Sequence, residues 1–420
     1  MSAGFRKDIQ YYRFCLYGFL KNLRFFEAFL ILFFLDNNLS YFAIGTLYAA
    51  REITVNIFEI PSGIIADAFG RRRTLILSFA FYILSFILFF FSRSYGGFFI
   101  AMITFSLGEA FRSGNHKAMI YHYITHMGWF GQKVHYYGNT RSWSQLGSAL
   151  SALSGAAIVF YSGSYEYIFL FSVVPYILDM INVYTYPRFL EGELKKAGWR
   201  KVKENFYQVF RDLLLALRTR SVITVIGSLS LYSGYYKAVK DYLQPVIAVW
   251  ALALPFFVGY NNEQRTSILV GIVFFAVYVL SSIASRYSGT FSEKFNSLAA
   301  PMNLTLFVGL LGGILSGIFY TTELWIFSVV LFILVYMIEN IRKPVGVAFL
   351  SSNVGKNVVA SILSVDSQVK SLSAAALAPL IGIFADLYSV GWSILIVSML
   401  LLLISPLLML KTNKIKKYGS

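Results

Sequence analysis

The sequence predicts an all-α membrane protein with about twelve transmembrane helices, arranged as two six-helix bundles around a central cavity. Its composition indicates the class. Of 420 residues, 57% are hydrophobic and 13% are charged, whereas soluble domains carry roughly 25% charged residues. The lysines and arginines gather between the apolar segments, which is typical of a chain that crosses a membrane many times.

A helix that crosses a membrane needs roughly 20 mainly apolar residues. The ranges that meet this requirement are 14–35, 41–66, 74–92, 97–120, 136–160, 167–187, 221–245, 267–285, 298–319, 324–345, 357–385 and 390–410. The end of the seventh range is open, because residues 246–258 are also apolar and are compatible with a re-entrant or surface segment.

The basic residues also predict the orientation. About 25 of the 36 lysines and arginines lie at the termini and in every second link, and the alternate links hold only Arg93 and Arg265. The positive-inside rule assigns the basic side to the cytoplasm. We therefore expect a multi-pass protein of the cell (inner or plasma) membrane with both termini in the cytoplasm. The same rule explains the net charge of +16 without a nucleic-acid partner.

A long basic link divides the chain. We expect a first six-helix bundle at residues 1–187, a linker at 188–220 and a second bundle at 221–420. The linker's apolar residues have helical spacing, which predicts an amphipathic helix on the membrane surface; they are Phe206, Val209, Phe210, Leu213, Leu214 and Leu217. Short repeats favour an internal duplication: Glu109 and Arg112 recur as Glu339 and Arg342.

The stretch FEIPSGIIADAFGRRRT, Phe58–Thr74, joins the second and third predicted spans. Its defining residues are Gly63, Asp67, Gly70, Arg71, Arg72 and Arg73. A tight link between membrane helices needs a small residue where they cross and a glycine where the backbone turns. A basic loop that only sets topology is one interpretation. We favour a gating ion pair, in which Asp67 binds an arginine or a neighbouring helix end and separates as the protein changes state.

This stretch matches the signature G-x-x-x-D-x-x-G-R-[RK]-x-[RK], so the chain resembles the major facilitator superfamily of secondary transporters. The predicted spans and the central link extend the resemblance over the whole chain. It implies alternating access without a cofactor. Gly108–Tyr123 resembles a fourth-helix pattern of a poorly assigned bacterial group, in which an aspartate often stands where this chain has His122. The antiporter signature of the fifth helix is partly present, as Gly138, Gly147 and Gly155 without its proline.

Charged residues inside the spans are candidates for function, because each costs roughly 2.5–3.5 kcal/mol on insertion scales. We expect them to face one another and a water-filled cavity, and interhelical salt bridges that only stabilise the bundle are the alternative. The candidates for substrate binding and ion coupling are Arg24, Glu27, Glu52, Asn56, Glu109, Arg112, Arg141, Gln145, Lys237, Asp241, Asp366, Gln368 and Lys370. A spacing of three or four residues places several on shared helix faces: Arg24 with Glu27, Glu109 with Arg112, Lys237 with Asp241, and Asp366 with Lys370.

The balance of charges predicts the cargo. Arginine and lysine suit a carboxylate, phosphate or sulfonate group, and buried acids suit an ammonium group or a transported proton. We therefore expect a monomeric transporter whose partners are a polar charged or zwitterionic small organic solute, protons and the lipid bilayer. A multidrug efflux antiporter, a divalent metal exporter and a non-transporting receptor remain alternatives. An enzyme is not expected, because the sequence has no Walker A loop, G-x-S-x-G or H-E-x-x-H motif.

Four histidines surround the link between the fourth and fifth spans: His116, His122, His126 and His135. The spacing of His122 and His126 is one that can bind a metal ion. No cysteine or acidic residue stands close to them in the sequence, so we expect no metal site.

Overall fold

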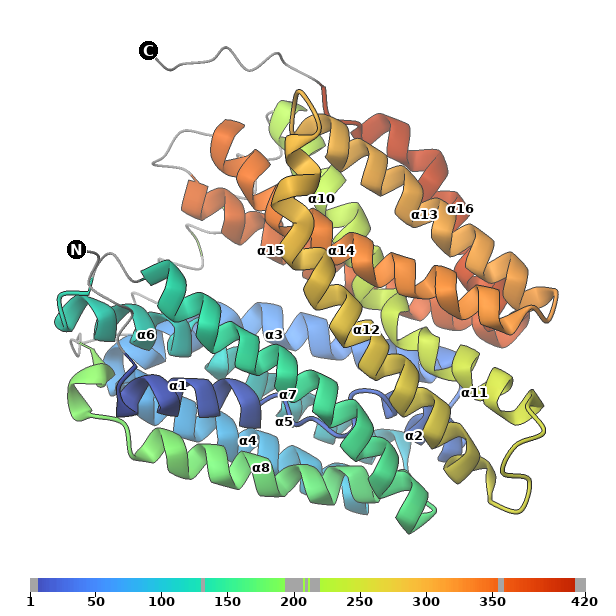
Figure 1. Cartoon of the computed structure of the whole chain (residues 1–420), viewed down its shortest axis with the longest axis horizontal. Coiled ribbons are helices and arrows are strands. Elements are labelled where there is room, and N and C mark those ends of the chain that lie inside the picture. The colour runs from blue at the N-terminus through green and yellow to red at the C-terminus, as the bar shows by residue number, and fades with distance from the viewer. Residues whose placement is uncertain are drawn as a thin grey trace. The chain divides into compact units, whose positions relative to one another are not determined.

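The computed structural model describes residues 7–129, 133–192, 220–353 and 359–411, with 207 and 211 (Figure 1). All regular elements in these ranges are helices. The described parts of Met1–Asn38, Ala50–Phe206 and Pro255–Tyr278 form one compact unit, and those of Leu39–Ala49, Tyr207–Leu254 and Val279–Ser420 form a second. The apolar residues that predict the amphipathic linker helix, between 206 and 217, lie outside the described residues.

The first unit is built mainly from α1 (Ile9–Leu20), α2 (Leu30–Asp36), α3 (Tyr41–Phe69), α4 (Arg71–Phe91), α5 (Tyr95–Arg112), α6 (Asn115–His126), α7 (Lys133–Ser162), α8 (Tyr167–Tyr184) and the 3₁₀ turn η2 (Arg188–Glu191). Helix α4 packs against α5 and α8, and α1 packs against α7 and α8. Aromatic rings fill the interior: the ring centroid of Phe169 lies 4.7 Å from that of Phe33 and 4.9 Å from that of Phe89.

The second unit is built mainly from α10 (Arg220–Val239), η3 (Lys240–Tyr242), α11 (Leu243–Ala253), residues 279–293 of α12 (Asn262–Glu293), α13 (Ala299–Thr321), α14 (Trp325–Asn353), α15 (Val359–Leu387), α16 (Val390–Ile404) and η4 (Ser405–Leu408); residues 262–278 of α12 belong to the first unit. Helix α10 packs against α15, and α13 packs against α14 and α16. Small residues allow these approaches. A Cβ atom on Gly317 would lie only 2.6 Å from the carbonyl oxygen of Gly391.

Every predicted span overlaps a helix of the structure. In the described ranges, eight helices are long and apolar enough to cross a membrane: α4, α7, α8, α12, α13, α14, α15 and α16. The all-helical class is therefore confirmed, while the count of twelve spans stays a prediction.

The prediction of one continuous helix over 14–35 is wrong, because residues 21–29 are not α-helical and separate α1 from α2. The Asn22 side chain donates a hydrogen bond of 2.6 Å to the Gly18 carbonyl and so competes with the helix's own bonding. The Tyr176 hydroxyl donates a 2.9 Å hydrogen bond to the Lys21 carbonyl. Irregular backbone at membrane depth is tolerated where protein groups satisfy it in this way.

Two other predicted spans are also interrupted. Range 97–120 is divided between α5 and α6 at Gly114, whose φ of 73° suits a residue without a side chain. Range 221–245 continues through η3 into α11, so the first part of the open segment 246–258 is helical as far as Ala253. Val246 and Ile247 of α11 are fully buried.

Glycines on α7 allow the interrupted first segment to pack closely. A Cβ atom on Gly147 would lie 2.5 Å from the Phe19 carbonyl oxygen, whereas one on Gly138 would meet nothing within 4 Å. We expect Gly147→Ala to lower the stability of the purified protein by about 1–3 kcal/mol, as overpacking does. Gly138→Ala on the same helix is the matched control, and thermal unfolding in detergent measures both. Equal melting temperatures would contradict this account of Gly147.

Candidate functional site

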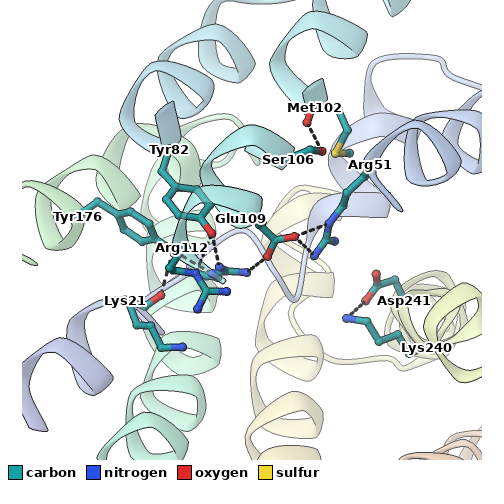
Figure 2. A network of polar contacts seen from close by, with 11 residues as sticks. Lys21, Arg51, Tyr82, Met102, Ser106, Glu109, Arg112, Tyr176, Lys240 and Asp241 are labelled. Atoms are coloured by element: carbon teal, nitrogen blue, oxygen red, sulfur yellow. Dashed lines mark hydrogen bonds and ion pairs between the residues drawn. The ribbon is translucent and has the colours of Figure 1, made fainter. Parts of the chain in front are cut away.

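An ion-paired network lies inside the first unit and joins three segments of the chain. The Glu109 carboxylate on α5 binds Arg24 of the interrupted first segment, with 3.2 Å between Nη1 and Oε1. It also binds Arg51 of α3, at 3.0 Å from Nε and 2.8 Å from Nη2 to Oε2. Figure 2 shows Glu109 with Arg51 on one side and Arg112, Tyr82, Tyr176 and Lys21 on the other. We call Arg24, Arg51 and Glu109 the ion-paired network.

Tyrosine hydroxyls orient the arginines. Arg24 donates through Nε to the Tyr176 hydroxyl at 2.9 Å and through Nη2 to the Tyr82 hydroxyl at 3.3 Å. Arg112 donates through Nε to the same Tyr82 hydroxyl at 3.0 Å. The network is thus fixed by hydrogen bonds as well as by charge, which a buried ion pair needs to offset its desolvation.

A cavity of about 410 Å³ adjoins the network within the first unit. Its basic lining residues are Lys21, Arg112, Lys117 and Arg141. Phe14, Tyr17 and Tyr137 supply aromatic surface, and Asn22 and Gln145 supply amide groups. No acidic side chain belongs to the described lining. We call this space the basic cavity, and its chemistry suits a solute that carries negative charge.

The structure brings some sequence candidates together and leaves others apart. Arg24 and Glu109 join the network, and Arg112, Arg141 and Gln145 line the basic cavity. Glu27, Glu52 and Asn56 are partly buried in the same unit. Arg112 shares a helix face with Glu109, as predicted, but the ion pairs of Glu109 come from Arg24 and Arg51.

The sequence candidates omitted several residues of this site: Lys21, Arg51, Tyr82 and Tyr176. Lys21 and Arg51 could have been identified from the sequence, because each is a charged residue within a predicted apolar range. The tyrosines could not, because 29 tyrosines are spread over the chain and only packing distinguishes these two.

The second unit holds a separate group of charges. Asp366 and Lys370 on α15 form the predicted ion pair at 2.5 Å, and Gln368 is partly buried near them on the same helix. The neighbours Lys240 and Asp241 pair at 3.2 Å in η3, where the continuous helix expected from the spacing of Lys237 and Asp241 is interrupted. Lys237 donates to the Ser371 hydroxyl at 3.0 Å.

The repeated pair Glu339 and Arg342 is buried in the second unit, on α14. Glu339 accepts hydrogen bonds of 2.9 and 3.1 Å from the Ser233 hydroxyl. Arg342 donates to the Met302 carbonyl, to the Thr305 hydroxyl at 3.0 Å and to the Ser228 carbonyl at 3.1 Å. Its acceptors lie on α10 and α13, so this arginine connects three helices.

The signature stretch between α3 and α4 has an acidic partner that the sequence did not suggest. Glu191 of η2 binds Arg72 at 3.0 Å and Arg73 at 3.8 Å. Arg72 also donates to the Tyr186 carbonyl at 3.0 Å. Gly70 has a φ of 100°, and a Cβ atom there would lie 3.0 Å from the Glu191 carboxylate. The turn therefore requires glycine on two counts.

Asp67 binds an arginine, as predicted, but within its own motif: Arg71 lies 3.6 Å away, and the Asp67 side chain is 52% exposed. The close helix crossing expected at Gly63 is wrong for the described residues, because a Cβ atom there would meet nothing within 4 Å. Glu191, with a 12% exposed side chain, is the better protected acid of this motif.

The histidines whose side chains are described make aromatic contacts. His116 stacks on Tyr17 with ring centroids 3.5 Å apart, and His126 stacks on Phe189 at 4.3 Å. Within the described ranges, no three histidine, cysteine, aspartate or glutamate residues are grouped as metal ligands. The side chain of His135 lies outside the description.

Comparisons with known proteins decide the family. The sequence model of the Major Facilitator Superfamily matches residues 22–376. The chain belongs to this superfamily. A relative described as "Uncharacterized MFS-type transporter YxaM", from Bacillus subtilis (strain 168), is 34% identical over 90 residues. That match spans 21% of this chain and 23% of the relative.

Solved structures of other transporters share the superfamily fold. The nucleoside transporter NupG aligns over 95% of this chain and 96% of its own, with a TM-score of 0.71 and 13% identity. A POT family transporter in complex with 5-aminolevulinic acid aligns over 97% and 96%, with a TM-score of 0.71 and 14% identity. At these identities the likeness shows the fold of this superfamily member, a multi-pass membrane protein.

Proposed function

We propose that the chain is a secondary active transporter that moves a polar charged or zwitterionic small organic solute by alternating access, coupled to protons. The observation that carries the proposal is the ion-paired network beside the basic cavity of about 410 Å³. Each charge costs roughly 2.5–3.5 kcal/mol inside a membrane. A charged cargo gives these charges a function beyond stabilising the helix packing.

Two structurally similar transporters support a polar cargo. They are a nucleoside transporter and a POT family transporter in complex with 5-aminolevulinic acid. Both cargoes are small and polar. Enzyme chemistry and a cofactor play no part in this proposal.

The coupling groups we propose are the buried acids of the two units. Among the described residues, Asp366 forms its ion pair with Lys370 of its own helix alone, and Glu109 binds two arginines. A carboxylate that exchanges a basic partner for a proton changes the charge of the site, and so can link proton movement to solute movement.

The rest of the arrangement follows from the sequence. We propose bundles at residues 1–187 and 221–420 joined by the 188–220 linker, a monomer, and both termini on the cytoplasmic side of the cell membrane. The signature stretch Gly63–Arg73 would then face the cytoplasm.

Flux in proteoliposomes with an imposed pH gradient tests the proposal. Uptake of a solute that the purified protein binds should rise with the gradient and fall when a protonophore removes it. Uptake that is indifferent to the gradient would contradict proton coupling while leaving transport intact.

The gating role of the signature stretch gives a further prediction. Glu191→Gln should slow transport severalfold, because it removes the carboxylate that Arg72 and Arg73 bind. Asp67→Asn should slow transport less, since the ion pair of Asp67 is half exposed and exposed pairs contribute little. Solute affinity, measured by titration calorimetry, should change little in either variant. Loss of binding with an unchanged rate per bound solute would contradict a gating role.

A further inference from the structure

Two basic side chains at the basic cavity, Lys21 and Arg112, form no ion pair with any of the described carboxylates. Within the described part of the chain, no carboxylate lies within 4 Å of the charged nitrogens of Lys21 or Arg112. Arg112 donates to the neutral hydroxyl of Tyr82. Both residues line the cavity, and Figure 2 shows them beside one another.

Two acids, Glu109 and Asp179, lie near this pair of cations, but neither belongs to the described lining of the basic cavity. Glu109 holds Arg24 and Arg51. Asp179 on α8 is 0% exposed and accepts a hydrogen bond of 3.2 Å from Asn182 through Oδ1, while its Oδ2 has no hydrogen-bond partner among the described residues. Because Lys21 and Arg112 line the cavity and neither acid does, a ligand in the cavity reaches both cations directly.

A helix end adds to the positive field. Helix α6 has 12 residues, and its N-cap Gly114 supplies no side-chain cap. Gly114, His116 and Lys117 line the cavity, so the first turn of α6 lies at the cavity wall. The N-terminus of a helix favours anions through its unpaired N–H groups and its dipole.

The remaining basic residues of the lining are less suited to hold the ligand's charge. Lys117 lies over the rings of Tyr121 and Tyr137, at 5.7 and 5.4 Å from their centroids. Arg141 is exposed. The part of the cavity best suited to bind an anion is therefore the one formed by Lys21, Arg112 and the N-terminus of α6.

We propose that the cargo is a small organic dianion, whose doubly charged group is bound by Lys21, Arg112 and the N-terminus of α6. A monoanion would leave one of the two cations without a counter-charge. The Arg112 guanidinium can form two parallel hydrogen bonds to a phosphate or carboxylate, while Lys21 acts as a point charge. Phe14, Tyr17 and Tyr137 contact the carbon body. This inference rests on the proposed transport function, which it deepens.

A phosphate monoester and a dicarboxylate share this chemistry, and binding assays distinguish them. The purified full chain in detergent is titrated at constant ionic strength with glycerol 3-phosphate, succinate, inorganic phosphate and the monoanion succinamate. We expect one of the two organic dianions to bind at least tenfold more tightly than succinamate. The preferred dianion identifies the class, and tighter binding of inorganic phosphate than of either would contradict an organic cargo.

The variants Lys21→Gln and Arg112→Gln should each weaken dianion binding about tenfold or more, since each removes a charged hydrogen-bond partner. Arg286→Gln, an exposed residue of α12, is the matched control and should bind as the wild type does. Arg112→Lys retains the positive charge but loses the guanidinium geometry. Its affinity for the dianion should lie between those of the wild type and Arg112→Gln. Size-exclusion chromatography verifies folding, and the wild-type comparison of dianion with monoanion does not depend on any variant.

Equal affinity for dianion and monoanion, or unchanged dianion binding by folded Lys21→Gln and Arg112→Gln proteins, would overturn the inference. Proteoliposome flux of a different solute would then still support the transporter. Tight dianion binding at these residues without any flux supports the site and contradicts the transport function on which its role as a cargo site depends.

Discussion

Glu109→Gln is expected to lower the free energy of unfolding by about 3–5 kcal/mol, the usual cost of removing one partner from a buried ion pair. The substitution leaves Arg24 and Arg51 without their carboxylate, at side-chain exposures of 10% and 20%. Thermal and denaturant unfolding in detergent measure the loss. Transport should be abolished even in the fraction that remains folded, because the network adjoins the cavity.

A double variant tests whether the stability lost in Glu109→Gln comes from leaving the arginines without a counter-charge. Arg51→Gln with Glu109→Gln removes one cation together with the acid, and so should recover part of the stability lost in Glu109→Gln alone. Glu293→Gln, on the exposed end of α12, is the control for the substitution itself. A Glu109→Gln protein with the same melting temperature as the wild type would show that the network contributes no stability.

Arg342→Met is expected to destabilise the second unit by about 2–5 kcal/mol, because an acceptor left without its donor costs about 1–3 kcal/mol. Arg342 is 2% exposed and serves two carbonyl groups and one hydroxyl. Its contact with the Tyr232 ring, 5.0 Å from centroid to Cζ, is lost as well. Unfolding in detergent provides the measurement, with exposed Arg286→Met as control.

The function of Arg342 is expected to be structural, which the same variant tests. Transport per folded molecule should stay near that of the wild type, in contrast to Glu109→Gln. A stable Arg342→Met protein that has lost transport would instead place Arg342 in the transport mechanism.

Hydropathy located the helices well and their interruptions badly, for a physical reason. A window of about 20 residues averages over the break at 21–29, whose flanks are strongly apolar. The break depends on the Asn22 bond to Gly18 and on the Tyr176 hydroxyl, which comes from 155 residues along the chain. No local sequence pattern predicts a hydrogen-bond partner so far away in the sequence.

Helical spacing predicted ion pairs within a helix and could not predict those between helices. Asp366 and Lys370 pair as their spacing indicates, because both side chains leave the same face of α15. Glu109 instead binds arginines 85 and 58 residues away. Its choice of partner is set by how α3 and the interrupted first segment pack on α5, which spacing does not encode.

Glu191 shows a second kind of omission. Glu191 stands beside Gly192 in a link with many basic residues. Those residues indicate topology, and nothing in the sequence distinguishes this acid as a partner of the signature stretch. Only the fold places it against Arg72 and Arg73, more than 100 residues earlier in the chain.

Counterflow in proteoliposomes tests the central claim, that this chain transports a charged solute through the basic cavity. Vesicles loaded with unlabelled glycerol 3-phosphate or succinate, whichever the protein binds, are diluted into trace labelled solute. We predict transient accumulation of label with the wild type and with Arg286→Gln, and none with Arg112→Gln. Uptake by the wild-type vesicles no faster than by protein-free vesicles would contradict the account.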